Sequence, residues 1–203
     1  MCQKVSRIPF IHAVMVSVIS LVYLLLFAAE IAQSQEQENS GQVMIVYDLS
    51  GSMALPLGKG IKSDLTKQAL LAGLKDLEKK AQVGLIAFGH RSKSSCSDLQ
   101  VAAALAPATN SVETIKAFLD RAEPKGRAPV AAALRLAGSK LAPGKPNQSL
   151  VLVVDGLDSC EEDPCGVVDH LFDQGVGFKA HVIGIGVEES QFKALSCVAA
   201  KLR

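Results

Sequence analysis

The sequence lacks tryptophan, contains few aromatic residues and carries almost no excess of either charge. Of its 203 residues only 4% are aromatic, while 49% are hydrophobic, so a buried core must be built from aliphatic side chains. This hydrophobic content excludes an intrinsically disordered chain. The net charge of +1 excludes a broadly basic nucleic-acid-binding protein, because such proteins need many unopposed Lys and Arg side chains. No repeat of solenoid length is found.

The N-terminal segment differs in character from the rest of the chain. Two basic residues precede an apolar run over 8–29, and a polar stretch follows over 33–40. This order is typical of a secretory signal over 1–34, with cleavage after Ser34. The apolar run is also long enough to be an uncleaved N-terminal membrane anchor. Either alternative predicts that the remainder is exported, periplasmic or secreted, behind a polar linker over 35–41.

Four of the five cysteines lie outside this segment, which is an even number. In an oxidising compartment such a set predicts disulfide bonds. The spacing leaves all three pairings open, although Cys160 and Cys165 are close enough in sequence to close a small loop. A zinc cluster is disfavoured because no two of these cysteines are separated by two residues. The four residues are Cys96, Cys160, Cys165 and Cys197.

Apolar strand segments and amphipathic helices alternate along residues 42–203, which we expect to form one domain. Strands are predicted at 43–47, 83–88, 150–154 and 178–187 with a short edge strand at 99–105, and helices at 63–80, 111–122, 130–141, 165–174 and 190–202. This alternation predicts an α/β fold, a doubly wound and mostly parallel sheet with helices on both faces. In such sheets ligands bind beyond the carboxyl ends of the strands.

Oxygen-bearing side chains follow two of the predicted strands. Asp48, Ser50 and Ser52 come directly after the strand at 43–47, and Asp155 follows the strand at 150–154. Carboxylate and hydroxyl oxygens are hard ligands that Mg²⁺ and Mn²⁺ accept. Either motif alone is also explained as a turn cap. Two of them at strand ends of one sheet favour a shared metal site.

These motifs resemble the metal-ion-dependent adhesion site of the von Willebrand factor A domain family. There, Asp-x-Ser-x-Ser after a strand precedes a Gly-x-Thr-Pro segment and a later strand followed by Asp-Gly. The resemblance extends over about residues 42–202 and is strongest to a bacterial exported branch. It implies a doubly wound fold that holds Mg²⁺ or Mn²⁺ at its top for binding rather than catalysis. In the family an acidic side chain of a protein partner usually completes the metal shell, so the resemblance implies a protein partner.

The chain departs from this pattern at one functional position. The segment 126–133 matches the second motif, but Ala128 stands where the family has Thr, and a methyl group cannot bind a metal. A water molecule in that place predicts weak binding that favours Mn²⁺. Arg127 suggests an alternative, in which its guanidinium pairs with Asp155 or Asp158 instead of an ion. Because of this departure, a metal-free domain that acts as a scaffold or inhibitor is a further alternative.

An enzyme is the remaining alternative. A strand-terminal Asp with a later Asp-Gly-x-Asp is also similar to haloacid-dehalogenase-type phosphatases, in which Asp48 would be the nucleophile. Those enzymes need a second acid two residues further on, where this chain has Ser50, whose hydroxyl has no useful pKa for that role. The sequence therefore predicts no catalytic residue.

Overall fold

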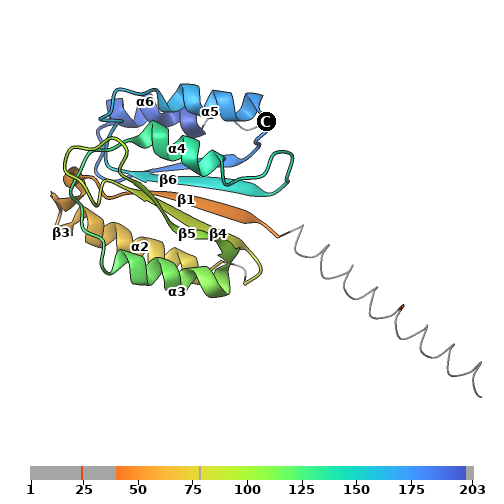
Figure 1. Ribbon diagram of the computed structural model, residues 1–203. Helices are drawn as coiled ribbons and strands as arrows, with labels where there is room; N and C mark the ends of the chain where they lie inside the picture. The colour runs from red at the N-terminus through yellow and green to blue at the C-terminus, as the bar shows by residue number, and fades with distance from the viewer. Residues whose placement is uncertain (1–23, 25–39, 78, 200–203) are drawn as a thin grey trace, which may run out of the picture. The chain divides into compact units, whose positions relative to one another are not determined.

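A computed structural model describes residues 24, 40–77 and 79–199 (Figure 1). The chain divides into the units Met1–Asn39 and Ser40–Arg203, and the fold below is that of the second. Apart from Leu24, the predicted signal or anchor lies outside the described residues, as do residues 35–39 of the predicted linker. Among the helices that are described, none has the length and apolar character that a bilayer crossing requires.

A sheet lies at the centre of the second unit. In the described residues it has five strands in the order β5-β4-β1-β6-β7. Four strands run parallel, and β5 pairs antiparallel at one edge. The strands are β1 (Gln42–Asp48), β4 (Gln82–Phe88), β5 (Leu99–Pro107), β6 (Gln148–Val154) and β7 (Lys179–Gly184). The predicted mostly parallel sheet and its edge strand are confirmed.

Helices cover both faces of this sheet, as Figure 1 shows. On one face lie α2 (Lys62–Lys75) and α3 (Ala108–Leu119), and on the other lie α4 (Val130–Gly138), α5 (Pro164–Asp173) and α6 (Glu189–Ala199). This arrangement confirms the doubly wound fold. It also explains why the central strands β1, β4 and β6 are continuous apolar runs, since helices cover both of their faces.

Alternate residues of β1 enter two separate cores. Met44 and Val46 belong to the cluster that contains residues of α4, α5 and α6, whereas Ile45 and Tyr47 belong to the cluster that contains residues of α2 and α3. Successive side chains of a strand point to opposite faces. Each fully buried aliphatic side chain contributes about 1.5–3 kcal/mol of hydrophobic stabilisation. β1 therefore packs against helices on both faces of the sheet.

Several predicted boundaries are wrong by a few residues. The helix predicted at 63–80 ends at Lys75, and Leu77 packs against the core from the turn that follows, so its apolar character was not a sign of further helix. The next helix begins three residues earlier than predicted, at Ala108, directly after Pro107. Proline is tolerated there because its missing N–H has no partner in a first helical turn.

Candidate functional site

Buried apolar side chains anchor the turn that follows β1. Asp48 ends the strand, and a 3₁₀ turn, η1 (Gly51–Ala54), follows. Met53 is fully buried and Leu49 nearly so, and the Gly51 N–H donates to the Gly126 carbonyl oxygen at 2.9 Å. Ser52 stays exposed at the surface of this turn. The Ser52 hydroxyl therefore faces solvent from a turn that buried apolar side chains hold in place.

The four residues predicted as metal ligands lie together, and we call them the rim site. The Ser50 N–H donates to Asp48 Oδ1 at 2.7 Å, and the two serine hydroxyls are 3.1 Å apart. Ser52 Oγ donates to Asp155 Oδ1 at 2.7 Å. Because β1 and β6 are neighbouring parallel strands, their carboxyl ends bring Asp48 and Asp155 to the same edge.

A cation that the sequence analysis missed completes this cluster. The Lys62 ammonium lies 2.9 Å from Asp155 Oδ2, and the two side chains are 12% and 1% exposed. Lys62 is the first residue of α2, which begins after the short antiparallel pair β2 (Pro56–Leu57) and β3 (Gly60–Ile61). No motif or periodicity in the sequence connects this lysine with Asp155, so only the fold identifies it.

The other carboxylate of the rim site has no such counter-ion. Burial raises the pKa of Asp48 to about 6, hydrogen bonds from Ser50 oppose the rise, and the charge of Asp155 adds to it. In the described part of the chain Asp48 forms no ion pair. With both carboxylates ionised, the rim site therefore carries one negative charge that Lys62 does not neutralise.

The spacing and chemistry of the rim-site oxygens fit a small divalent cation. Ligands of an octahedral ion at 2.0–2.1 Å are about 3.0 Å apart along an edge, and the Ser50 and Ser52 hydroxyl oxygens are 3.1 Å apart. The buried Asp48 carboxylate adds a charged hard ligand beside them. No group of three or more His, Cys, Asp or Glu side chains suited to a metal is present among the described residues, so any ion here depends on the serines.

The loop that carries Ala128 and Arg127 does not supply a ligand or a cation. Ala128 is 7% exposed and its methyl group belongs to the buried apolar core. Arg127 donates to the Ser159 carbonyl oxygen, and Asp158 accepts from the backbone N–H groups of Ala131 and Cys160. The predicted pairing of Arg127 with Asp155 or Asp158 is therefore wrong, because Lys62 and the backbone already occupy these carboxylates.

Two disulfide bonds settle the open pairing. Cys96, after β4, is bonded to Cys160, after β6, and Cys165 of α5 is bonded to Cys197 of α6. The small loop considered between Cys160 and Cys165 does not form. The first bond joins two loops at the carboxyl edge of the sheet, and it therefore braces the surface around the rim site.

Charged groups next to this brace are satisfied locally. Asp98 is buried and accepts from the Arg91 guanidinium at 2.8 Å and from the backbone N–H groups of Arg91 and Ser92. Burial alone would raise the pKa of Asp98, but the hydrogen bonds from Arg91 and Ser92, with a smaller electrostatic contribution from His90, outweigh it and lower the pKa. His90 Nε2 pairs with Gln100 Oε1 at 2.9 Å, whereas the buried Nδ1 of the same ring has no hydrogen-bond partner among the residues that the structure describes.

We expect the hydrogen bonds to Asp98 to cause part of the loss of stability of the domain in acid. A carboxyl group whose pKa is lower in the folded chain stabilises it above the unfolded pKa of about 3.9, and this contribution is lost as the pH falls through the folded value. Asp98→Asn should lower the free energy of unfolding at pH 7 by about 1–3 kcal/mol. It should also flatten the loss of stability that urea titrations measure as the pH falls below about 3.9. An unchanged acid limb in the variant would contradict this assignment.

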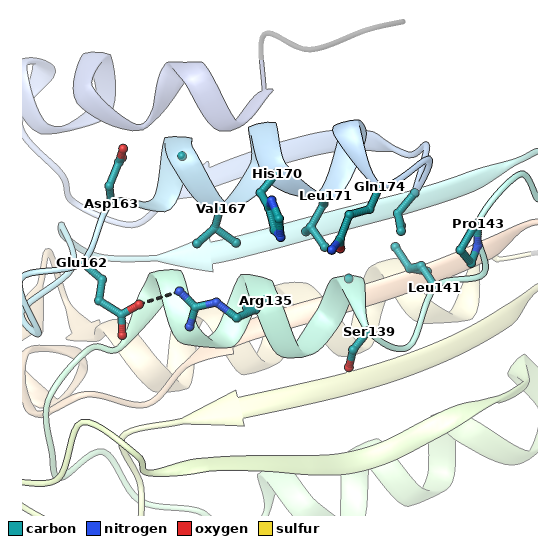
Figure 2. A pocket seen from close by; sticks show the side chains of 13 residues that line it. Arg135, Ser139, Leu141, Pro143, Glu162, Asp163, Val167, His170, Leu171 and Gln174 are labelled. Atoms are coloured by element: carbon teal, nitrogen blue, oxygen red, sulfur yellow. Dashed lines mark hydrogen bonds and ion pairs between the residues drawn. The ribbon is translucent and has the colours of Figure 1, made fainter.

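A separate groove of about 1000 Å³ lies between α4 and α5. Figure 2 shows Val167, His170 and Leu171 of α5 facing it, and the ion pair between Arg135 and Glu162 at one end. None of the rim-site residues lines the groove. The groove is mixed in character and is not part of the predicted site.

Comparison with known proteins identifies the family. A family profile for the von Willebrand factor type A domain matches residues 43–157, which is more than half of the chain and includes the whole rim site. The chain belongs to the von Willebrand factor type A domain family.

Proteins of similar sequence and structure are known. The chain is 26% identical over 164 residues to the uncharacterized protein YwmD of Bacillus subtilis (strain 168), covering 75% of this chain and 71% of that protein. An aerotolerance-related membrane protein from Bacteroides fragilis NCTC 9343 has a similar structure, with a TM-score of 0.59 and 21% identity over 74% of this chain and 70% of that one. The pilus adhesin SpaC from Lactobacillus rhamnosus GG gives a TM-score of 0.66 and 15% identity, covering 80% of this chain but 28% of the adhesin.

Proposed function

We propose that the chain is an exported interaction module that binds a protein partner at the carboxyl edge of its sheet. The observation that carries the proposal is the rim site, in which Asp48, Ser50, Ser52 and Asp155 meet beside an exposed surface. Asp48, Ser50 and Ser52 would hold Mg²⁺ or Mn²⁺, with Asp155 as the second carboxylate. The ion would attract an acidic side chain of the partner.

The surroundings of the rim site support contact with another protein. Ser52 is exposed, so a partner can approach it directly. Leu55, which follows η1, and Leu157, which lies two residues after Asp155, are 55% and 42% exposed, so an apolar side chain near each motif is available for contact with a partner. Two disulfide bonds agree with an oxidising, extracytoplasmic location, as does the pilus adhesin among the proteins that share the fold.

Titration with metal ions tests the site. Millimolar Mn²⁺ or Mg²⁺ should raise the unfolding temperature of the chain, because a ligand that binds only the folded state stabilises it. Asp48→Asn should abolish this rise, since it removes the charged donor. Asp173→Asn is the matched control, because Asp173 is exposed at the opposite end of α5 from the rim loops. A rise that survives Asp48→Asn unchanged would place the ion elsewhere.

A metal-free scaffold is the second candidate, and the apolar burial of Ala128 favours it. A pull-down from an extracytoplasmic fraction, run with Mn²⁺ and with EDTA, separates the two functions. Metal-mediated adhesion requires that the partner is lost in EDTA and with Ser52→Ala. Retention under both conditions would favour the scaffold.

A further inference from the structure

Lys62 stands where a helix does not favour a cation. It is the first residue of α2, and the positive end of the helix dipole lies at that end. Its backbone N–H donates to the Leu55 carbonyl oxygen at 3.1 Å, and its own carbonyl oxygen accepts from Thr66 Oγ1 at 2.7 Å. The start of the helix is therefore held in place, and the unfavourable position of the ammonium needs a compensating partner.

That partner is Asp155, and the pair is built into the rim site. Asp155 has both carboxylate oxygens engaged, Oδ1 by Ser52 and Oδ2 by Lys62. The Lys62 stem is covered by the loop after β7, since its Cε lies close to Gly186. A nearly buried lysine with a fixed stem is a stationary charge rather than a mobile surface side chain.

We infer that the Lys62 ammonium is the resident cation of the rim site, and that a divalent ion binds Asp155 only by displacing it. The inference depends on the proposed function in one respect, because it assumes that the oxygens of the rim site bind the metal ion. An ammonium group and a divalent ion that contact the same carboxylate lie close enough to repel each other. Lys62 therefore weakens metal binding at the rim site, because its ammonium already neutralises the Asp155 carboxylate.

Lys62→Met tests this inference, since it keeps the length of the side chain and removes the charge. Without metal, the variant should unfold at a lower temperature than the parent chain, because Asp155 is left buried without a counter-ion. Its apparent Kd for Mn²⁺, measured by calorimetry and by the shift of the unfolding temperature, should be at least tenfold lower than that of the parent chain. Lys67→Met is the matched control on the same helix, because Lys67 pairs with the exposed Asp120 at 3.5 Å. It should leave the Mn²⁺ affinity unchanged.

A second variant keeps the test decisive if Lys62→Met is too unstable to purify. Lys62→Met combined with Asp155→Asn removes both charges, and it should recover most of the lost stability without the gain in Mn²⁺ affinity. Equal Mn²⁺ affinity in the parent chain and Lys62→Met would overturn the inference while leaving a metal site at Asp48 intact. No response to Mn²⁺ in either chain would overturn the inference and the proposed metal site together.

Discussion

Replacing both Cys96 and Cys160 by serine is expected to lower the free energy of unfolding by about 4 kcal/mol. The two residues are 64 apart in sequence, and a bond that closes a loop of this length removes much of the entropy of the unfolded chain. For a domain of this size the unfolding temperature should fall by roughly 8–16 °C. Thermal unfolding followed by circular dichroism measures the loss directly.

The second disulfide provides the matched control for this prediction. Cys165 and Cys197 are 32 residues apart, and halving the loop length reduces the entropic effect by only about 0.6 kcal/mol. Removal of either bond should therefore destabilise the chain to a similar extent. Only the Cys96–Cys160 bond joins the loops near the rim site, so only its removal should also weaken the Mn²⁺ response. Equal Mn²⁺ responses in the two double variants would refute the bracing role.

Gly89→Ala should strongly destabilise the loops around the rim site, with a loss of about 3 kcal/mol or more in the free energy of unfolding. Gly89 follows β4 with a φ of +76°, a conformation that disfavours any side chain. An added Cβ would also lie 2.6 Å from the Arg127 carbonyl oxygen and 2.9 Å from Ser50 Cα. These backbone atoms cannot move without displacing the turn that carries Ser50 and Ser52.

Gly58→Ala separates the two causes of this loss. Gly58 has a φ of +61° and nothing lies within 4 Å of an added Cβ, so only the conformational cost of about 1 kcal/mol applies. Urea unfolding of both variants should therefore give a clearly larger loss for Gly89→Ala. Equal losses would mean that the loops yield to the added methyl group, and that the rim site is less rigid than described.

The grouping of the rim-site residues could be predicted from the sequence, because all of them follow predicted strands of one parallel sheet. Asp48 and Asp155 each follow a continuous apolar strand, and the carboxyl ends of parallel strands share an edge. Ser50 and Ser52 then follow from their spacing in the turn. The hydrogen bonds among these residues agree with that reasoning, while metal binding stays a prediction.

Contacts that depend on the packing of distant loops could not be obtained in this way. Lys62 reaches Asp155 because β2 and β3 turn the chain before α2 begins, and no periodic pattern encodes that turn. Cys96 pairs with Cys160 although β1 lies between β4 and β6, and the cysteine spacing alone does not give this pairing. Arg127 was a candidate for a cation near Asp155, because it is next to Ala128, which stands where the family has a metal ligand. In the structure its guanidinium donates to the Ser159 carbonyl oxygen instead.

Crystals of the chain soaked in Mn²⁺ and measured at the manganese absorption edge test the central claim most directly. We expect one anomalous peak bounded by the oxygens of Asp48, Ser50, Ser52 and Asp155, with the Lys62 ammonium moved away from Asp155. Manganese found only at surface carboxylates, with the Lys62–Asp155 pair unchanged, would contradict it.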